Sequence, residues 1–223
     1  KNKSKHLICV NDKPFLCYLM DNLLKAGYKD IVLVVGFGAD LMCDFLKKYK
    51  FKATIVNQFE ILGPKEKEYG TLCPMKCVKN LIGKENFLAV YGDNLFSVKD
   101  LKAMNKDDNF NYVAARVEKD HPEKYGVLIT DKEGRLIKII EKPKEFVGNL
   151  VNTGMYKFTP EVFATIPKIK LSPRGEYELT DAMTLLAQQG KVKVNTIKDY
   201  WMDFGNPGDI RKMRAFLDSQ HTV

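Results

Sequence analysis

Asp93 follows a short apolar run, and its position suggests a metal-binding carboxylate. Residues 87–91 have the length and composition of a buried strand, and Gly92 separates them from Asp93. Ligands in open α/β sheets bind beyond the carboxyl ends of the strands, so a carboxylate here is well placed to hold a divalent cation. From this run alone, a turn aspartate that caps the next helix explains the sequence equally well. Two other stretches bear on the choice: residues 201–205, and a lysine-bearing loop at the start of the chain.

Length and composition suit one α/β domain with a sizeable core. The chain has 223 residues, of which 45% are hydrophobic. No linker or internal repeat divides it, so we expect a single domain over residues 1–223. No apolar run approaches the roughly 18 residues that a membrane-spanning helix needs, so a membrane is not an expected partner.

Five scattered cysteines, an odd number, suggest reduced thiols and a cytoplasmic location. Cys73 and Cys77 are spaced as on one helix face, but none of the three histidines is near them in the sequence. Structural zinc sites usually have four Cys or His ligands, so we disfavour a zinc site here.

The formal net charge of +8 would suit a polyanionic ligand, nucleic acid included. The lysines are spread along the chain with glutamate and aspartate between them, and no nucleic-acid-binding motif is recognisable. A solvated, lysine-rich surface explains the charge better. We therefore expect no nucleic-acid partner, while a homo-oligomer stays open.

Hydrophobic periodicity predicts the elements that position these residues. In the first sixty residues, strands and helices alternate with short loops, which is the pattern of a doubly wound sheet. The predicted elements there are strands at 7–10, 31–35 and 53–56, with helices over 15–26 and around 41–46 between them.

The rest of the chain predicts further strands and helices and one hairpin. Residues 125–130 and 135–140 are joined by a turn at 131–134, as in a β-hairpin that forms a small lobe on the sheet. The strand at 151–158 contains Gly154, and glycine in a strand often marks close approach of a ligand or of another backbone. The other predictions are strands at 87–91, 112–117 and 192–197, helices at 71–82, 98–104 and 177–189, and a charged loop at 58–69. A last helix is predicted to begin with Asn206 as N-cap and Pro207 at its first position and to extend through Leu217.

Short motifs occur in order along the chain, and together they resemble the sugar-1-phosphate nucleotidylyltransferases. They are Ser4-Lys5-His6-Leu7 with Asn11-Asp12-Lys13-Pro14; Gly70-Thr71; Tyr91-Gly92-Asp93-Asn94; Tyr125-Gly126-Val127 with Glu141-Lys142-Pro143 and Asn152-Thr153-Gly154; Arg174-Gly175-Glu176 through Leu179-Thr180-Asp181; and Trp201-Met202-Asp203-Phe204-Gly205. Each motif is weak alone, but their order over essentially the whole chain is specific. The chain is most similar to the glucose-1-phosphate thymidylyl- and uridylyltransferases of this family. The resemblance implies a Rossmann-like doubly wound mixed sheet of the nucleotidyltransferase type, with a small β-hairpin lobe.

The resemblance also implies a reaction. A sugar 1-phosphate, expected to be glucose 1-phosphate, attacks the α-phosphorus of a nucleoside triphosphate, expected to be dTTP or UTP, and pyrophosphate leaves. Cations must offset the charge because two anions are brought together. Asp93 and Asp203 are implied to hold Mg²⁺, which prefers a few carboxylates together with phosphate oxygens and water. Lys5 is implied to contact the triphosphate and to stabilise charge in the transition state.

The other implied residues divide between two subsites. Glu141 would bind a pair of sugar hydroxyls, Lys142 the phosphate of the sugar, and Gly70 would let main chain approach the base. The implied nucleotide-binding set is Gln58, Gly70, Thr71, Gly92 and Asp93. The implied sugar-phosphate set is Gly126, Glu141, Lys142, Asn152, Thr153, Gly154 and Arg174. Without the motifs, Lys5, Glu141-Lys142 and Arg174 would read as ordinary exposed residues, and Asp203 as a turn residue before the last helix.

Three departures from the family leave alternatives open. The family opens with a strand and a glycine-rich, phosphate-binding loop, and we expect both to precede Lys1, with the strand beside residues 31–35. A chain without the loop would instead be a catalytically inactive nucleotide- or sugar-nucleotide-binding regulatory subunit. Residues 7–10 lack the proline that the family often has, and the loop at 62–69 is longer than usual, which leaves the base open. A glycosyltransferase is disfavoured, because it would want two aspartates flanking one residue where Asp93-Asn94 stands.

Overall fold

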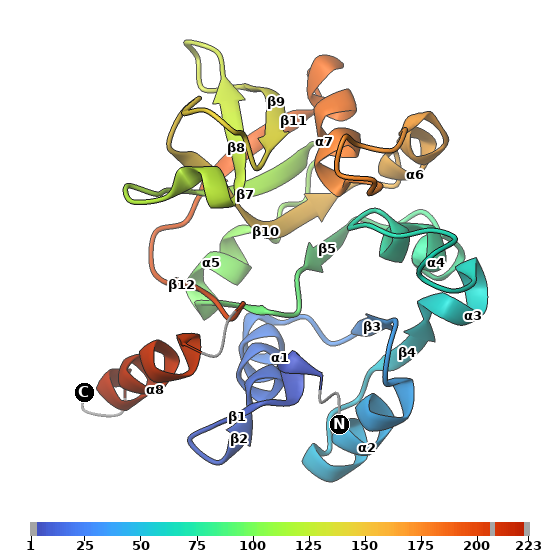
Figure 1. Ribbon diagram of the computed structural model, residues 1–223, viewed down its shortest axis with the longest axis vertical. Coiled ribbons are helices and arrows are strands. Elements are labelled where there is room, and N and C mark those ends of the chain that lie inside the picture. Colours follow the sequence, from blue (N-terminus) through green and yellow to red (C-terminus); the bar gives the residue numbers. More distant parts are fainter. Residues whose placement is uncertain (1–3, 206–207, 221–223) are drawn as a thin grey trace.

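The computed structural model describes residues 4–205 and 208–220, which form a mixed α/β structure around one six-stranded sheet (Figure 1). The strand order is β11-β7-β10-β8-β9, and β5 joins the sheet by pairing with β10. The mixed sheet predicted from the sequence is therefore present. Its strands are β5 (Phe87–Val90), β7 (Asn111–Val117), β8 (Gly126–Thr130), β9 (Leu136–Glu141), β10 (Leu150–Phe158) and β11 (Val192–Thr196).

A smaller α/β unit precedes that sheet in the chain. Helices α1 (Phe15–Ala26) and α2 (Ala39–Tyr49) accompany two parallel strands, β3 (Val32–Val35) and β4 (Thr54–Asn57), as the sequence predicted. Helix α1 ends at Gly27, whose φ of 102° lets its N–H bond the carbonyls of the last turn.

The prediction that residues 7–10 form a strand of the parallel sheet is wrong. A 3₁₀ helix, η1 (Lys5–Leu7), comes first, and the short strand β1 (Cys9–Val10) pairs antiparallel with β2 (Lys13–Pro14). Between them Asn11 and Asp12 have φ of 47° and 64°, as in the tight hairpin turns that favour these residues. This turn folds the segment back on itself and keeps it out of the sheet.

Short elements account for the other differences. Residues 58–69, predicted as a loop, begin with helix α3 (Gln58–Leu62), whose first turn is capped by the Asn57 side chain. Strands β6 (Asn94–Phe96) and β12 (Trp201–Asp203) pair with each other, and they were missed because three residues show no period. The remaining elements are α4 (Cys73–Ile82), α5 (Val98–Ala103), η2 (Pro122–Lys124), α6 (Val162–Thr165), η3 (Ile166–Lys168), α7 (Leu179–Gln188) and α8 (Asp209–Gln220). The predicted cap and first position of the last helix, residues 206 and 207, lie outside the described residues.

Strand β10 changes neighbours along its length. Val151 pairs with β8, whereas the stretch from Met155 onward pairs with β5 on the same edge. The register with β7 shifts between Asn152 and Tyr156, and Gly154 lies inside that shift with a φ of 78°. L side chains rarely adopt such a φ, so glycine is what permits the strand to change partners at this point.

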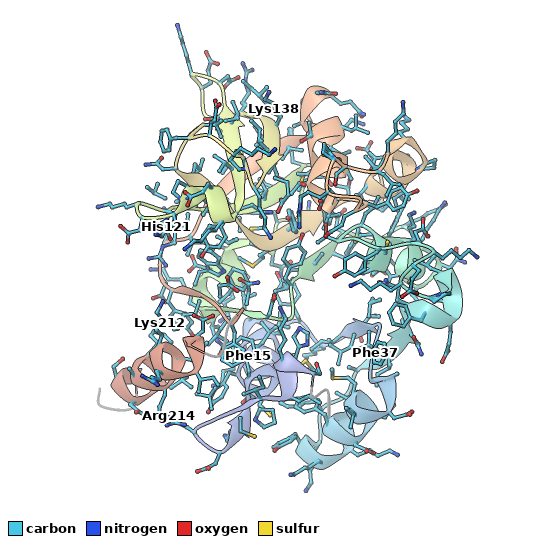
Figure 2. The ribbon with its side chains drawn as sticks, viewed as in Figure 1. Phe15, Phe37, His121, Lys138, Lys212 and Arg214 are labelled. Carbon is cyan, nitrogen blue, oxygen red and sulfur yellow. The ribbon has the colours of Figure 1, made fainter. Side chains whose placement is uncertain are left out.

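Buried aromatic contacts tie the end of the chain to its beginning. Phe15 lies in α1 (Figure 2). Its ring stacks on that of Phe204, with 4.5 Å between ring centroids. Both side chains belong to one buried cluster that also contains Leu95 of β6 and Met213 of α8. This packing fixes the segment that follows β12 against the first helix.

Strands β3 and β5 each pair along one edge only within residues 4–205 and 208–220. β3 pairs with β4, and β5 with β10 alone. All four residues of β5 are only partly buried, although the sequence predicted a buried strand. The strand expected before Lys1 would meet an edge left unpaired, and it stays a prediction. In the same described ranges, no helix combines the length and the apolar character needed to cross a membrane.

Candidate functional site

The two aspartates come together because β6 and β12 pair. Asp93 immediately precedes β6, and Asp203 lies opposite Asn94 in the β12–β6 register. The N–H of Phe204 donates to the carbonyl of Asp93 at 2.7 Å. Residues 110 positions apart in sequence thus meet beyond the carboxyl end of β5.

The carboxylates of Asp93 and Asp203 place two negative charges close together. Burial of the carboxyl and then the nearby Asp93 carboxylate raise the pKa of Asp203 to about 6, and Lys5 and Lys142 act in the opposite direction. Lys5 forms an ion pair with the Asp93 carboxylate. Because Asp203 is solvent-exposed as a residue, a ligand could reach the pair from outside.

The two carboxylates fit a hard divalent cation. Oxygen ligands from one or two carboxylates, completed by substrate phosphates and water, are what Mg²⁺ usually takes. Among the described residues, no group of three or more His, Cys, Asp or Glu side chains is arranged to hold a metal ion. A cation between Asp93 and Asp203 would therefore depend on oxygens from the substrate.

Two polar residues that lie in the quoted motifs, but for which the sequence analysis expected no role, flank Asp93. The Asn94 amide donates to Asp93 Oδ1 at 2.9 Å, and Asn94 Oδ1 accepts from Trp201 Nε1 at 2.6 Å. His6 lies against Gly92, where a Cβ would be 3.3 Å from the imidazole Cδ2, and burial lowers the pKa of His6. Asn94 could have been suspected because it adjoins Asp93, whereas nothing local singles out His6.

Glu141 and Lys142 lie at the end of the β8–β9 hairpin. Gly126 pairs with Glu141, and a Cβ at Gly126 would lie 2.8 Å from Glu141 Oε2, so the glycine makes room for that carboxylate. Burial and then the neighbouring Glu178 raise the pKa of Glu141. Lys142 has a φ of 43°, which is rare for a residue with a side chain, and its N–H bonds the carbonyl of Tyr125 at 3.1 Å.

Polar side chains on β10 form hydrogen bonds within the protein. Thr153 is 1% exposed, and its hydroxyl donates to the carbonyl of Ala114 at 2.9 Å, so that donor is already used within the protein. Asn152 bonds the Tyr156 hydroxyl and the N–H of Gly154. Gly154 leaves space for the ring of Tyr91, because a Cβ there would lie 2.5 Å from Tyr91 Cδ2.

The absence of a side chain at Gly70 makes room for another part of the protein's own backbone. Its φ is 134°, and a Cβ would lie 2.2 Å from the Tyr177 carbonyl oxygen, so the missing side chain admits backbone of the protein itself. The N–H of Tyr177 bonds the carbonyl of Tyr69 at 2.9 Å, and the N–H of Leu72 bonds the carbonyl of Tyr177 at 3.0 Å. The 69–72 segment is therefore fixed to the segment that precedes α7.

Gln58 and Thr71 are placed on separate elements of the expected nucleotide side. Gln58 is the first residue of α3, beyond the carboxyl end of β4, and is 8% exposed. Thr71 is half-buried and its hydroxyl accepts from the N–H of Leu179 at 2.9 Å.

Arg174 is surrounded by carboxylates. Its Nη1 lies 3.1 Å from Glu178 and 3.5 Å from Glu141, and its Nη2 lies 3.4 Å from Glu176. Arg174 is thus brought to Glu141, as the expected sugar-phosphate set requires. Lys142 acts on both ends of the site, because its charge opposes the rise in pKa of Glu141 and also that of Asp203.

Comparison with known proteins gives a consistent picture. Residues 1–220 match the nucleotidyl transferase family. The chain is 33% identical over 217 residues to the bifunctional protein GlmU of Methanocaldococcus jannaschii, covering 97% of this chain and 50% of that protein. It is 31% identical over 230 residues to the UTP–glucose-1-phosphate uridylyltransferase AglF of Haloferax volcanii, covering 100% of this chain and 91% of AglF.

Solved structures share the fold. A UDP-glucose pyrophosphorylase from Acinetobacter baumanii superposes with a TM-score of 0.76 at 20% identity, covering 99% of this chain and 88% of that one. The chain spans about half the length of several curated relatives that it matches, GlmU among them.

Proposed function

The chain belongs to the nucleotidyl transferase family, and we propose that it joins a nucleoside triphosphate to a sugar 1-phosphate and releases pyrophosphate. The observation that carries the proposal is the meeting of Asp93 and Asp203, with Lys5 on one carboxylate and Lys142 within electrostatic reach of the other. Such an arrangement suits a reaction that brings two phosphates together.

In the proposed reaction, an oxygen of the sugar phosphate attacks the α-phosphorus, and the bond from that phosphorus to the pyrophosphate oxygen breaks. Asp93 and Asp203 would hold Mg²⁺, which when bound offsets negative charge on the phosphates. Lys5 exchanges its ion pair with Asp93 for the triphosphate. Lys142 positions the attacking phosphate, and Glu141 accepts hydrogen bonds from sugar hydroxyls.

Glucose 1-phosphate and either UTP or dTTP are the proposed substrates. AglF, which acts on UTP and glucose 1-phosphate by its name, is similar over 100% of this chain. Other relatives carry different names, such as a mannose-1-phosphate guanyltransferase from Aspergillus oryzae that is 28% identical. The base and the sugar therefore need a direct measurement, and a cytoplasmic location stays a prediction.

A thermal-shift panel of dTTP, UTP, CTP and GTP with Mg²⁺, followed by a pyrophosphate-release assay with glucose 1-phosphate, tests this function. We expect UTP or dTTP to raise Tm most and pyrophosphate to form only when the sugar phosphate is present. Absence of any nucleotide or sugar-phosphate binding would refute the proposal. Binding without pyrophosphate release would favour the catalytically inactive subunit instead.

A further inference from the structure

Glu178 is a buried carboxylate whose two oxygens face different parts of the site. Only 2% of the residue is exposed. Oε1 accepts from Arg174 Nη1 at 3.1 Å and from the Ser172 hydroxyl at 3.2 Å. Oε2 accepts from the Thr71 hydroxyl at 3.4 Å. One side chain thus bonds a residue of the expected sugar-phosphate set and a residue of the expected nucleotide-binding set.

A helix-capping role does not account for this carboxylate. Glu178 is the N-cap residue of α7, yet its side chain makes no capping hydrogen bond to that helix. Removing a carboxylate from water costs free energy, and hydrogen bonds or charges must offset that cost. Here the offset comes from Arg174, Ser172 and Thr71, all of them outside α7.

On the nucleotide side, Thr71 is held at several points. Its hydroxyl accepts from the N–H of Leu179 at 2.9 Å and donates to Glu178 Oε2 at 3.4 Å. The N–H of the next residue, Leu72, donates to the carbonyl of Tyr177, the residue before Glu178. A movement of Thr71 would therefore reach Glu178 both through its side chain and through the backbone of the segment that precedes α7.

On the sugar side, Arg174 links Glu178 to Glu141. The same Nη1 lies 3.1 Å from Glu178 and 3.5 Å from Glu141, whose carboxylate occupies the space left by Gly126. The direction of the guanidinium is set mainly by Glu178, because this is the shorter of the two contacts and comes from the buried partner. The direction of Arg174 in turn sets the position of the positive charge that pairs with Glu141.

We propose that Glu178 is a positioning residue that couples the two substrate subsites. Its Oε2 is hydrogen-bonded to Thr71 and so responds to the position of that residue, and its Oε1 sets the direction of Arg174 toward Glu141. This inference rests on the function proposed above and adds how its two subsites communicate. A nucleotide bound against the 70–71 segment acts on Thr71, and the hydrogen bond from Thr71 to Glu178 passes any displacement on to Arg174, which faces the sugar phosphate. Because coupling between sites is reciprocal, sugar phosphate also tightens nucleotide binding by the same factor.

Equilibrium binding of glucose 1-phosphate tests the coupling, with and without saturating α,β-methylene-UTP, an analogue that cannot release pyrophosphate. For the unaltered protein we expect the analogue to lower the Kd of glucose 1-phosphate by about fivefold or more, within the usual range of coupling between sites. In Glu178→Gln we expect that factor to fall close to one. Thr71→Val, which removes a single hydroxyl, should weaken the coupling in the same direction.

Glu176→Gln is the matched control, because Glu176 also ion-pairs with Arg174 but has no hydrogen bond to Thr71 among those of the described residues. It should keep the coupling factor. A purely structural role for Glu178 would lower Tm and leave the factor unchanged, and that result in Glu178→Gln or Thr71→Val overturns the inference. If the unaltered protein binds neither ligand, the proposed function fails and this inference fails with it. If it binds both and all variants couple normally, only this inference fails.

Discussion

At the sugar-phosphate end of the site, Arg174 and Glu141 already have charged partners within the protein. Arg174 touches Glu141, Glu176 and Glu178, and Asn152 and Thr153 bond groups inside the sheet. At the aspartate end, two carboxylates lie close together, and Lys5 pairs with one of them. The pKa of Asp203 is accordingly raised to about 6 by burial and by Asp93. The sugar-phosphate end is preorganised by contacts within the chain, whereas at the aspartate end a bound cation and substrate would complete the balance of charge.

The largest effect should come from removing charge at the aspartate end. Asp93→Asn or Asp203→Asn should lower kcat by at least about a hundredfold, the usual loss when one preorganised electrostatic group at a reacting centre is removed. Pyrophosphate release measures it, and Tm should stay the same or rise because repulsion is relieved. Asp120→Asn, an exposed site with the same change of charge, is the control. Near-normal turnover in both aspartate variants would remove the proposed distinction between the two ends.

Lys142→Ala should act on one substrate. Loss of a hydrogen bond to a charged group costs about 1.5–3 kcal/mol, so the KM for glucose 1-phosphate should rise about 10- to 100-fold, with a smaller change for the nucleotide. Steady-state kinetics with each substrate varied in turn gives both values. Lys144→Ala, two residues further on and also exposed, should change neither. Equal effects of Lys142→Ala on both KM values would assign Lys142 to the triphosphate.

Gly154→Ala should destabilise the point where β10 changes partners. A Cβ there would overlap the Tyr91 ring and would also need a left-handed φ, so we expect a loss of about 1–3 kcal/mol in the free energy of unfolding. Gly134→Ala is matched, because Gly134 has a φ of 75° but a Cβ added there would meet nothing within 4 Å. Urea unfolding of both variants separates backbone strain from overlap. Equal losses would mean that the Tyr91 contact contributes nothing.

The smallest effect concerns pH. Asp203 in the folded protein keeps its proton up to about pH 6, whereas the unfolded chain releases it near pH 4. The folded state therefore binds more protons between about pH 4 and pH 6, so the contribution of this group to the free energy of unfolding falls as pH rises through that window. Tm of the unaltered protein, compared with Asp203→Asn without divalent cations, should show this fall. Parallel curves for the two proteins would contradict the raised pKa.

The fold was predictable where elements are long enough to show a period. Helix α1 and strands β3 and β10 were found with nearly correct bounds, since their apolar side chains repeat over several residues. Strands β6 and β12 were missed, although they are what joins Asp93 to Asp203. The strand expected at residues 7–10 failed because the turn at Asn11-Asp12 is local and overrides a short apolar run.

The sequence indicated which residues belong to the candidate site better than it indicated where their side chains point. Glu141 and Arg174 were named from motifs, and the structure brings them together. Thr153 was named from the same kind of motif, but its side chain points to Ala114, because a register shift decides which way a residue faces. His6 and Glu178 have no local signal, since their importance comes from residues distant in sequence.

Within residues 4–205 and 208–220, β3 and β5 each have an edge that pairs with no strand, and such edges affect how a protein behaves in solution. An unpaired strand edge offers a row of N–H and C=O groups that can accept a strand from any chain nearby. Both edges carry half-buried apolar side chains, which adds an attractive surface to the exposed hydrogen-bonding groups. Molecules that present such edges associate with one another as concentration rises, and a strand supplied within the same polypeptide would compete with that association at a far higher local concentration.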